Sequence, residues 1–151
     1  MTTRVETAVE TFAKGFNCAQ AVFSTYAPIL GISEREALQV ATGFGAGMGR
    51  LQEVCGAITG AFMLIGCKHG MVKPEDTAAK EEAYALERQF AGCFKGLHGS
   101  ILCKDLLGCD LNTPEGKKIF SENTLIEKVC TQCVRDAATL VEEMIFDERG
   151  A

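Results

Sequence analysis

Apolar residues along this chain recur at the three- and four-residue spacing of an α-helix, and almost no segment alternates as a β-strand would. The spacing predicts helices over 5–14, 18–30, 33–40, 54–68, 74–94, 100–107, a segment starting at 113, and 130–146. No Pro- or Ser-rich linker, internal repeat or low-complexity tract divides these segments. We therefore expect an all-α fold: residues 1–151 should form one compact helical bundle of about six to eight helices.

Residues that begin helices mark several of these segments. Asn17 is a typical N-cap, and Ser33 with Glu36 forms a capping box. Pro74 fits the first turn of the long fifth helix, and Thr113 followed by Pro114 fits a cap and first helical residue.

Glycines concentrate between residues 43 and 60, at the centre of the predicted bundle. The spacing excludes a dinucleotide-binding G-x-G-x-x-G loop, because the third glycine position falls on Met48 or Arg50. Gly56 and Gly60 are instead four residues apart, which places both on one face of a helix and lets another backbone approach closely. We expect a Gly-rich, close-packed core.

Four cysteines, Cys18, Cys55, Cys103 and Cys130, fall at or near the starts of predicted helices. A helix N-terminus carries unpaired N–H groups and a partial positive charge, so it stabilises a thiolate and lowers the pKa of a cysteine there. Cys18 follows the N-cap Asn17 and is the best candidate for an attacking thiol, with Cys55 or Cys130 as its partner.

Charge and hydropathy exclude some classes of function. The net charge of −5, with the basic residues scattered, argues against nucleic-acid binding. The longest uncharged apolar stretch, 54–67, is shorter than the roughly 20 residues that cross a bilayer, so no membrane insertion is expected. The N-terminal residues are too polar for a secretory signal, which favours a cytoplasmic location where thiols stay reduced.

Eight cysteines in that compartment point to redox chemistry, a metal or simple burial. The four helix-start cysteines are 37, 48 and 27 residues apart, unlike the tight cysteine runs of ferredoxins. Ligands from several helices can still meet in a bundle core, so an iron–sulfur cluster or zinc on Cys18, Cys55, Cys103 and Cys130 stays open. Four converging thiolates repel one another, which favours a bound cation or oxidation to disulfides.

The other cysteines are assigned lesser roles. Cys67 is expected in the core, and Cys93 and Cys109 are expected to be buried or half-buried without a function. Cys133 lies one turn after Cys130 in a C-x-x-C pair, so it is a candidate resolving thiol.

Two further side chains could act near the thiols. His98 is five residues before Cys103 and is a candidate proton donor or substitute ligand, although an ordinary half-exposed position is the simpler reading. Arg50 could stabilise a thiolate or bind an anion, and a surface salt bridge is the alternative.

Several segments together resemble one known family. They are Gly15-Phe-Asn-Cys18-Ala-Gln, Gly43-Phe-Gly-Ala-Gly-Met-Gly-Arg50, Glu53-Val-Cys55-Gly-Ala-Ile-Thr-Gly60, Gly99-Ser-Ile-Leu-Cys103-Lys-Asp-Leu-Leu-Gly108, Thr113-Pro-Glu-Gly116 and Cys130. This pattern resembles the C_GCAxxG_C_C family, which is described as redox-active and named for its cysteine motif. The central element here reads Cys-Gly-Ala where the name writes Gly-Cys-Ala. The resemblance implies that Cys18, Cys55, Cys103 and Cys130 are the family's four cysteines.

Three functions remain from the sequence. The first is a cysteine-based redox protein, an oxidoreductase if it is an enzyme, which cycles thiols and disulfides or transfers electrons through an iron–sulfur cluster. The second is a non-enzymatic zinc protein that uses the same thiolates. The third is a helical module that self-associates into a homo-oligomer through its Gly/Ala faces. The sequence names no substrate and no redox partner.

Overall fold

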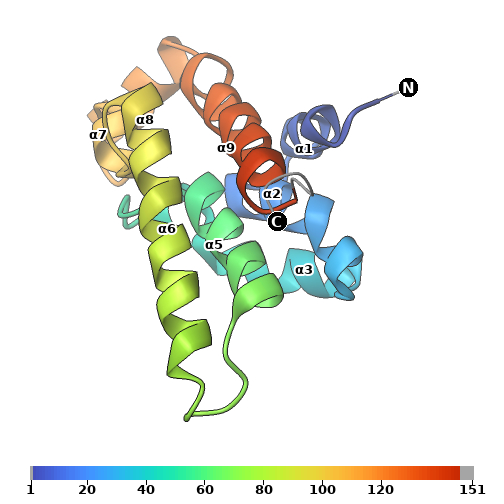
Figure 1. Cartoon of the computed structure of the whole chain (residues 1–151). Coiled ribbons are helices and arrows are strands. Elements are labelled where there is room, and N and C mark those ends of the chain that lie inside the picture. The colour runs from blue at the N-terminus through green and yellow to red at the C-terminus, as the bar shows by residue number, and fades with distance from the viewer. Residues whose placement is uncertain (1, 147–151) are drawn as a thin grey trace.

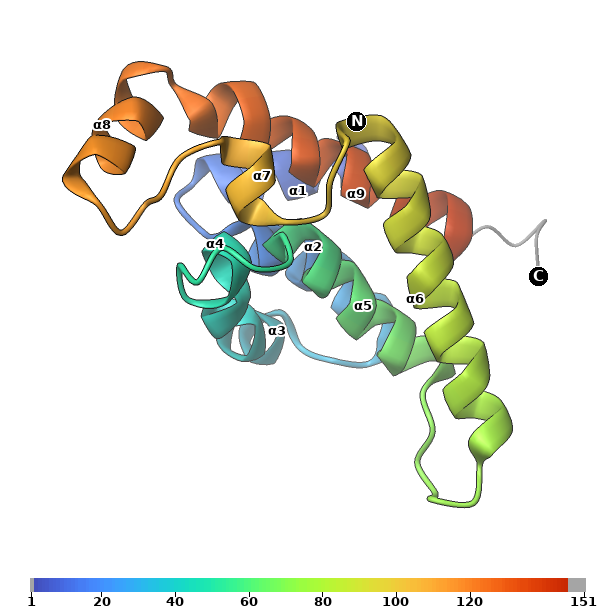
Figure 2. The same cartoon turned by 90° about the vertical axis from the view of Figure 1, so that its left-hand side faces the viewer.

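Two largely apolar helices, α2 (Cys18–Tyr26) and α5 (Gly56–His69), pack against each other at the centre of the computed structural model (Figure 2). The structure describes residues 2–146. A Cβ added at Gly60 would stand 2.8 Å from the carbonyl oxygen of Ala19, so only a glycine lets α5 approach α2 this closely. The close-packing role predicted for Gly60 therefore holds.

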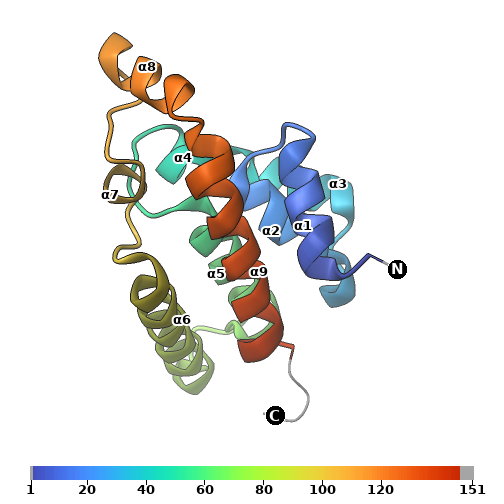
Figure 3. The ribbon, with the colours of Figure 1, turned by 90° about the horizontal axis from the view of Figure 1, so that it is seen from above.

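The other long helices cover this central pair. α1 (Arg4–Ala13) packs against α2 and α9 (Thr131–Met144), while α3 (Glu34–Ala41) packs against α2 (Figure 1). α6 (Thr77–His98) lies along α5 and α9 and extends beyond them (Figures 1 and 3). Each covering helix turns an apolar stripe toward the centre and a charged face toward solvent.

Short elements gather at one end of the bundle, away from the loop that joins α5 to α6 (Figures 2 and 3). They are α4 (Gly45–Met48), α7 (Cys103–Leu107) and α8 (Pro114–Glu122). A small second core lies here, built on three buried residues, Cys103, Leu107 and Leu111. This end of the molecule contains most of the cysteines.

Helix boundaries differ from the prediction in several places, including α7, which begins at Cys103 and not at residue 100, and α6, which continues to His98. The helix expected over 18–30 becomes a 3₁₀ helix, η1 (Ala27–Leu30), after Tyr26, because Pro28 has no N–H for an α-helical bond. The fifth helix begins only at Thr77, since the Asp76 side chain caps it, and Pro74 lies in the preceding turn. The last helix is preceded by a π-helical turn, η3 (Ile126–Cys130). Another 3₁₀ turn, η2 (Thr42–Phe44), follows α3.

The predicted all-α class is confirmed. Apart from α4, which is a left-handed turn, residues 2–146 contain eight α-helices, α1–α3 and α5–α9. Over the same residues there is no strand, only an isolated antiparallel bridge between Val54 and Leu102. None of the helices in the described part of the chain is long and apolar enough to cross a membrane.

Candidate functional site: a cavity lined by five cysteines

The isolated bridge sets two cysteines side by side. The N–H of Cys55 donates to the carbonyl of Ile101 (2.8 Å). The N–H of Cys103 donates to the carbonyl of Glu53 (2.7 Å). Cys55 is the N-cap of α5, and Cys103 is the first residue of α7. Two helices that start 47 residues apart in sequence, at Gly56 and Cys103, therefore begin next to each other, and both thiols are buried.

Cys18 enters the site from the first turn of α2. Asn17 caps this helix in a capping box with Gln20, and its side-chain amide donates to the carbonyl of Thr42 (2.9 Å). The start of α2 is thus tied to the end of α3. Cys18 is half-buried, and its Sγ lies close to Gly56 at the start of α5.

The remaining two cysteines come from the opposite side of the site. Cys130 is the last residue of the π-helical turn η3, and Cys133 lies one turn later in α9. Cys130 is half-buried and Cys133 is buried. Cys130 therefore lies at the start of α9, as the sequence suggested, but a π-turn continues directly into that helix. Such π-turns often occur at functional sites.

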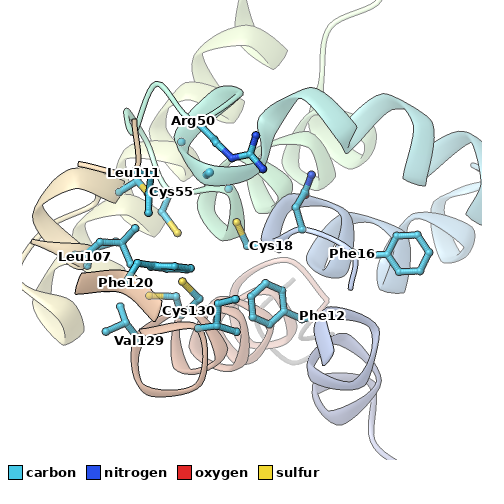
Figure 4. Close-up of a pocket in the computed structure, with 18 of the residues that line it drawn as sticks. Phe12, Phe16, Cys18, Arg50, Cys55, Leu107, Leu111, Phe120, Val129 and Cys130 are labelled. Carbon is cyan, nitrogen blue, oxygen red and sulfur yellow. The ribbon is translucent and has the colours of Figure 1, made fainter. Parts of the chain in front are cut away.

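All five thiols line one cavity of about 300 Å³, which we call the cysteine cavity. Figure 4 shows Cys18, Cys55 and Cys130 projecting into it from three different elements. The structure thus brings together the four cysteines selected from the sequence and adds Cys133. Apolar side chains form most of the remaining wall, namely Phe12, Leu106, Leu107, Leu111, Phe120, Ile126 and Val129. The thiols therefore share an apolar environment.

A left-handed backbone turn forms another wall of the cavity. Five consecutive residues, Ala46 to Arg50, have φ between 54° and 70°. Glycines at 47 and 49 adopt this conformation freely, whereas a residue with a Cβ pays about 1–2 kcal/mol. The turn directs the N–H of Ala46 toward the Cys18 sulfur, where it offsets part of the rise in the thiol's pKa that Cys55 and burial cause. Backbone strain of this kind is typical of functional sites.

Gln52 secures the other side of this loop. Its buried side chain donates to the carbonyl of Cys109 (2.8 Å) and accepts from the N–H of Leu111 (2.8 Å). Burial raises the pKa of the Cys103 thiol, and a hydrogen bond with Gln52 offsets part of that rise. Sequence reasoning missed Gln52, because a single glutamine in a loop carries no pattern.

Thiol–thiol contacts dominate the electrostatics. Hydrogen bonding with Cys55, followed by burial, raises the pKa of Cys18 well above its ordinary value. Hydrogen bonding with Cys133 is the largest cause that raises the pKa of Cys55 in turn. Cys18, Cys55 and Cys133 therefore form a row of interacting thiols, with Cys55 in the middle.

Cys103 and Cys130 respond mainly to burial. Loss of solvent raises the pKa of Cys103 to about 11 and that of Cys130 to about 12, and the neighbouring thiols add to both shifts. The helix-start argument predicted the opposite direction. It was right that N–H groups at the start of α2 favour the Cys18 thiolate, since the N–H of Ala19 lowers the Cys18 pKa. Burial beside other thiols outweighs this effect.

Predictions for two of the other cysteines were wrong. Cys67 is exposed, because the last turn of α5 from Gly66 to Lys68 is uncovered. Cys93 is exposed because the buried face of α6 runs through Phe90 and Phe94. Cys109 is half-buried, as expected.

His98 occupies the half-exposed position that was its simpler interpretation, and Arg50 lies beside the thiols and forms no surface salt bridge within the described residues. His98 hydrogen-bonds Asp136 (2.8 Å), stacks on Phe94 and is not among the cavity-lining residues. Arg50 lines the cavity, and among residues 2–146 it has no carboxylate within 4.0 Å.

The positions of the thiols bear on whether they could bind a metal ion. A tetrahedral site requires three or four donors converging at about 2.3 Å from one ion. Within residues 2–146, no group of three or more Cys, His, Asp or Glu side chains is arranged so that it could hold an ion. The described thiols therefore do not converge on one point as the ligands of a single zinc ion do.

The fold and the site together define an all-α protein built around a cavity of free thiols. The chain belongs to the family described as "Putative redox-active protein (C_GCAxxG_C_C)", whose profile matches residues 16–144. The family recognised from the sequence is thereby confirmed. No curated protein and no solved structure matches the chain.

Proposed function

We propose that this protein is a thiol–disulfide redox protein in which Cys18 and Cys55 form a reversible disulfide. The contact between these two thiols inside the cysteine cavity is the observation that supports it most directly. Cys18 is half-buried, whereas Cys55 is only 7% exposed. Cys18 is therefore the attacking thiol and Cys55 the resolving thiol.

The reaction is an exchange with a substrate disulfide. Cys18 loses its proton, and its sulfur attacks one sulfur of the substrate, whose S–S bond breaks as the first thiol leaves with a proton. Cys55 then loses its proton and attacks the Cys18 sulfur, which releases the second substrate thiol. Two electrons and two protons pass to the substrate, and the protein retains a Cys18–Cys55 disulfide. The reverse reaction oxidises a substrate dithiol.

The surroundings of the pair serve this exchange. The N–H groups of Ala19 and Ala46 stabilise the Cys18 thiolate when it forms. Cys133 contacts Cys55 and offers a second partner for it, which would free Cys18 for another substrate. Because the pKa of Cys18 is raised, the reduced pair keeps its protons near neutral pH, and the rate of exchange should rise as the pH increases above 8.

The test is to treat fully reduced protein, free of oxygen, with bis(2-hydroxyethyl) disulfide and then count thiols. In a Cys67→Ser, Cys93→Ser background, which removes the two exposed thiols, the count should fall from six to four, and peptide mapping should find Cys18 joined to Cys55. Cys18→Ser and Cys55→Ser should abolish this disulfide, whereas Cys93→Ser, which changes an exposed residue, should not.

Metal analysis of the same oxygen-free preparation distinguishes the alternatives. Stoichiometric iron or zinc, together with no intramolecular disulfide, would overturn the proposal in favour of a metal protein. If neither metal nor a disulfide between cavity cysteines is found, the result would overturn the proposal in favour of a self-association module. We also propose a cytoplasmic location, because cysteine thiols are kept reduced there.

A further inference from the structure

A second cavity opens beside the cysteine cavity. It has a volume of about 560 Å³, and we call it the outer cavity. Its lining residues are Ala46, Arg50, Leu111, Asn112, Lys117 and Phe120. Ala46, Arg50, Leu111 and Phe120 line both cavities, so the two spaces meet along this shared wall.

The charges on these walls have one sign. Arg50 and Lys117 are the charged residues that line the two cavities, and within the described residues no Asp or Glu lines either of them. The chain as a whole has a net charge of −5. A purely cationic lining on an acidic protein therefore creates a local positive potential beside the thiols.

Arg50 is held in place by its backbone. Its carbonyl accepts a hydrogen bond from the side-chain amide of Asn112 (2.8 Å), and its φ of 67° continues the left-handed turn. Figure 4 shows its side chain at the edge of the cysteine cavity. Without a carboxylate partner in the described part of the chain, the guanidinium is available to a ligand.

We infer that the substrate is a small, negatively charged disulfide, or the anionic thiol that it yields. The inference rests on the proposed function. The sulfur atoms of the substrate enter the apolar cysteine cavity beside Cys18, and its carboxylate groups remain in the outer cavity on Arg50 and Lys117. A cavity of about 300 Å³ suits a small molecule, since ligand pockets commonly measure about 300–1,000 Å³.

The electron transfer is the exchange described above, with the anionic disulfide as the oxidant. Its S–S bond breaks, the Cys18–Cys55 bond forms, and two anionic thiols leave. A dianion is repelled by the overall charge of the protein, so preference for it requires the local cations.

Three disulfides that differ in charge test the inference: 3,3′-dithiodipropionate (a dianion), bis(2-hydroxyethyl) disulfide (neutral) and cystamine (a dication). The measurement is the second-order rate at which each oxidises the reduced protein, at low salt and at 0.5 M salt. Each rate is divided by the rate of the same disulfide with free 2-mercaptoethanol, which removes differences in intrinsic reactivity.

The wild-type protein should prefer the dianion, and salt should reduce that preference. Arg50→Gln and Lys117→Gln should each lower the ratio of the dianion rate to the neutral rate on the order of 3- to 10-fold. Lys73→Gln, which removes an exposed cation from the distant α5–α6 loop, is the matched control and should have no effect.

Equal normalised rates for all three disulfides would overturn this inference while leaving the proposed function intact. A dianion rate that is unchanged in both Arg50→Gln and Lys117→Gln would overturn it as well. Failure of all three to form a Cys18–Cys55 disulfide would instead remove the proposed function itself.

Discussion

Gly56 lies so close to Cys18 that a Cβ added at residue 56 would stand 2.5 Å from the Cys18 sulfur and 2.9 Å from the carbonyl oxygen of Phe44. The Cys18 thiol thus occupies the space that a side chain at residue 56 would fill. The glycine of the Cys-Gly-Ala element at the start of α5 therefore leaves room for a cysteine on α2.

Replacing Gly56 by Ala should therefore disturb both stability and chemistry. The added methyl group must displace Cys18 or the Phe44 backbone, which should destabilise the fold by roughly 1–3 kcal/mol in urea unfolding. Displacing the Cys18 sulfur should also slow formation of the Cys18–Cys55 disulfide. Gly66→Ala is the control, because residue 66 lies in the same helix with open space around it. That variant should be unchanged or more stable by up to about 1 kcal/mol. Equal stability of the two variants would contradict the close contact.

A second pair of glycines tests the left-handed turn. Gly49 has φ of 58° and nothing within 4 Å of an added Cβ, so Gly49→Ala should cost about 1–2 kcal/mol through backbone strain alone. Gly43 is equally open but has no positive φ, and Gly43→Ala should be neutral or slightly stabilising. Urea unfolding gives the free energy of unfolding of each variant. If Gly49→Ala is as stable as the wild-type protein, the backbone at residue 49 is not left-handed.

Stability should fall steeply at alkaline pH while the thiols are reduced. Below pH about 9, a thiol such as Cys103 is protonated in both the folded and the unfolded chain. Above it, the unfolded chain releases protons, whereas folded Cys103 holds its proton until its pKa of about 11. The free energy of the unfolded state therefore falls relative to that of the folded state as pH rises above about 9, by up to about 1.4 kcal/mol per pH unit for each such thiol.

Urea unfolding between pH 7 and 10.5, in the presence of a non-thiol reductant, measures this slope. Oxidation to the Cys18–Cys55 disulfide removes two of the contributing thiols, so the oxidised protein should show a shallower decline. A reduced protein whose stability is flat from pH 8.5 to 10.5 would be incompatible with raised thiol pKa values.

Labelling with iodoacetamide should follow exposure. In reduced protein at pH 7 to 8, Cys93 and Cys67 should react first, because both are exposed. Cys18 should stay largely unlabelled, since its raised pKa leaves little thiolate. Mass spectrometry across a pH series gives the order, and rapid labelling of Cys18 below pH 8 would restore the argument from helix starts.

Much of the helical framework could be predicted because its determinants are local. The capping box of Asn17 and Gln20, and that of Ser33 and Glu36, occur in the structure as the sequence indicated. A cap acts through residues three positions apart, so no distant part of the chain is needed to recognise it. Pro74 was misplaced for the same local reason, since Asp76 offers a better cap two residues later.

Other features depended on packing that no local pattern encodes. Exposure of Cys67 follows from which elements cover the last turn of α5, and the contact of Cys133 with Cys55 joins α9 to the start of α5. The direction in which the Cys18 pKa shifts could not be predicted from local sequence. The Cys55 thiol, which raises this pKa, lies 37 residues away in the chain.

The sequence by itself determined the all-α class, the positions of most helix starts and the membership of the family, because periodicity, caps and motif segments are properties of short stretches of chain. The tertiary structure decided that five thiols share one apolar cavity, that Gln52 and a left-handed turn hold its walls, and that burial raises the thiol pKa values. These properties arise from desolvation and contact between distant segments, and such contacts exist only once the chain has folded.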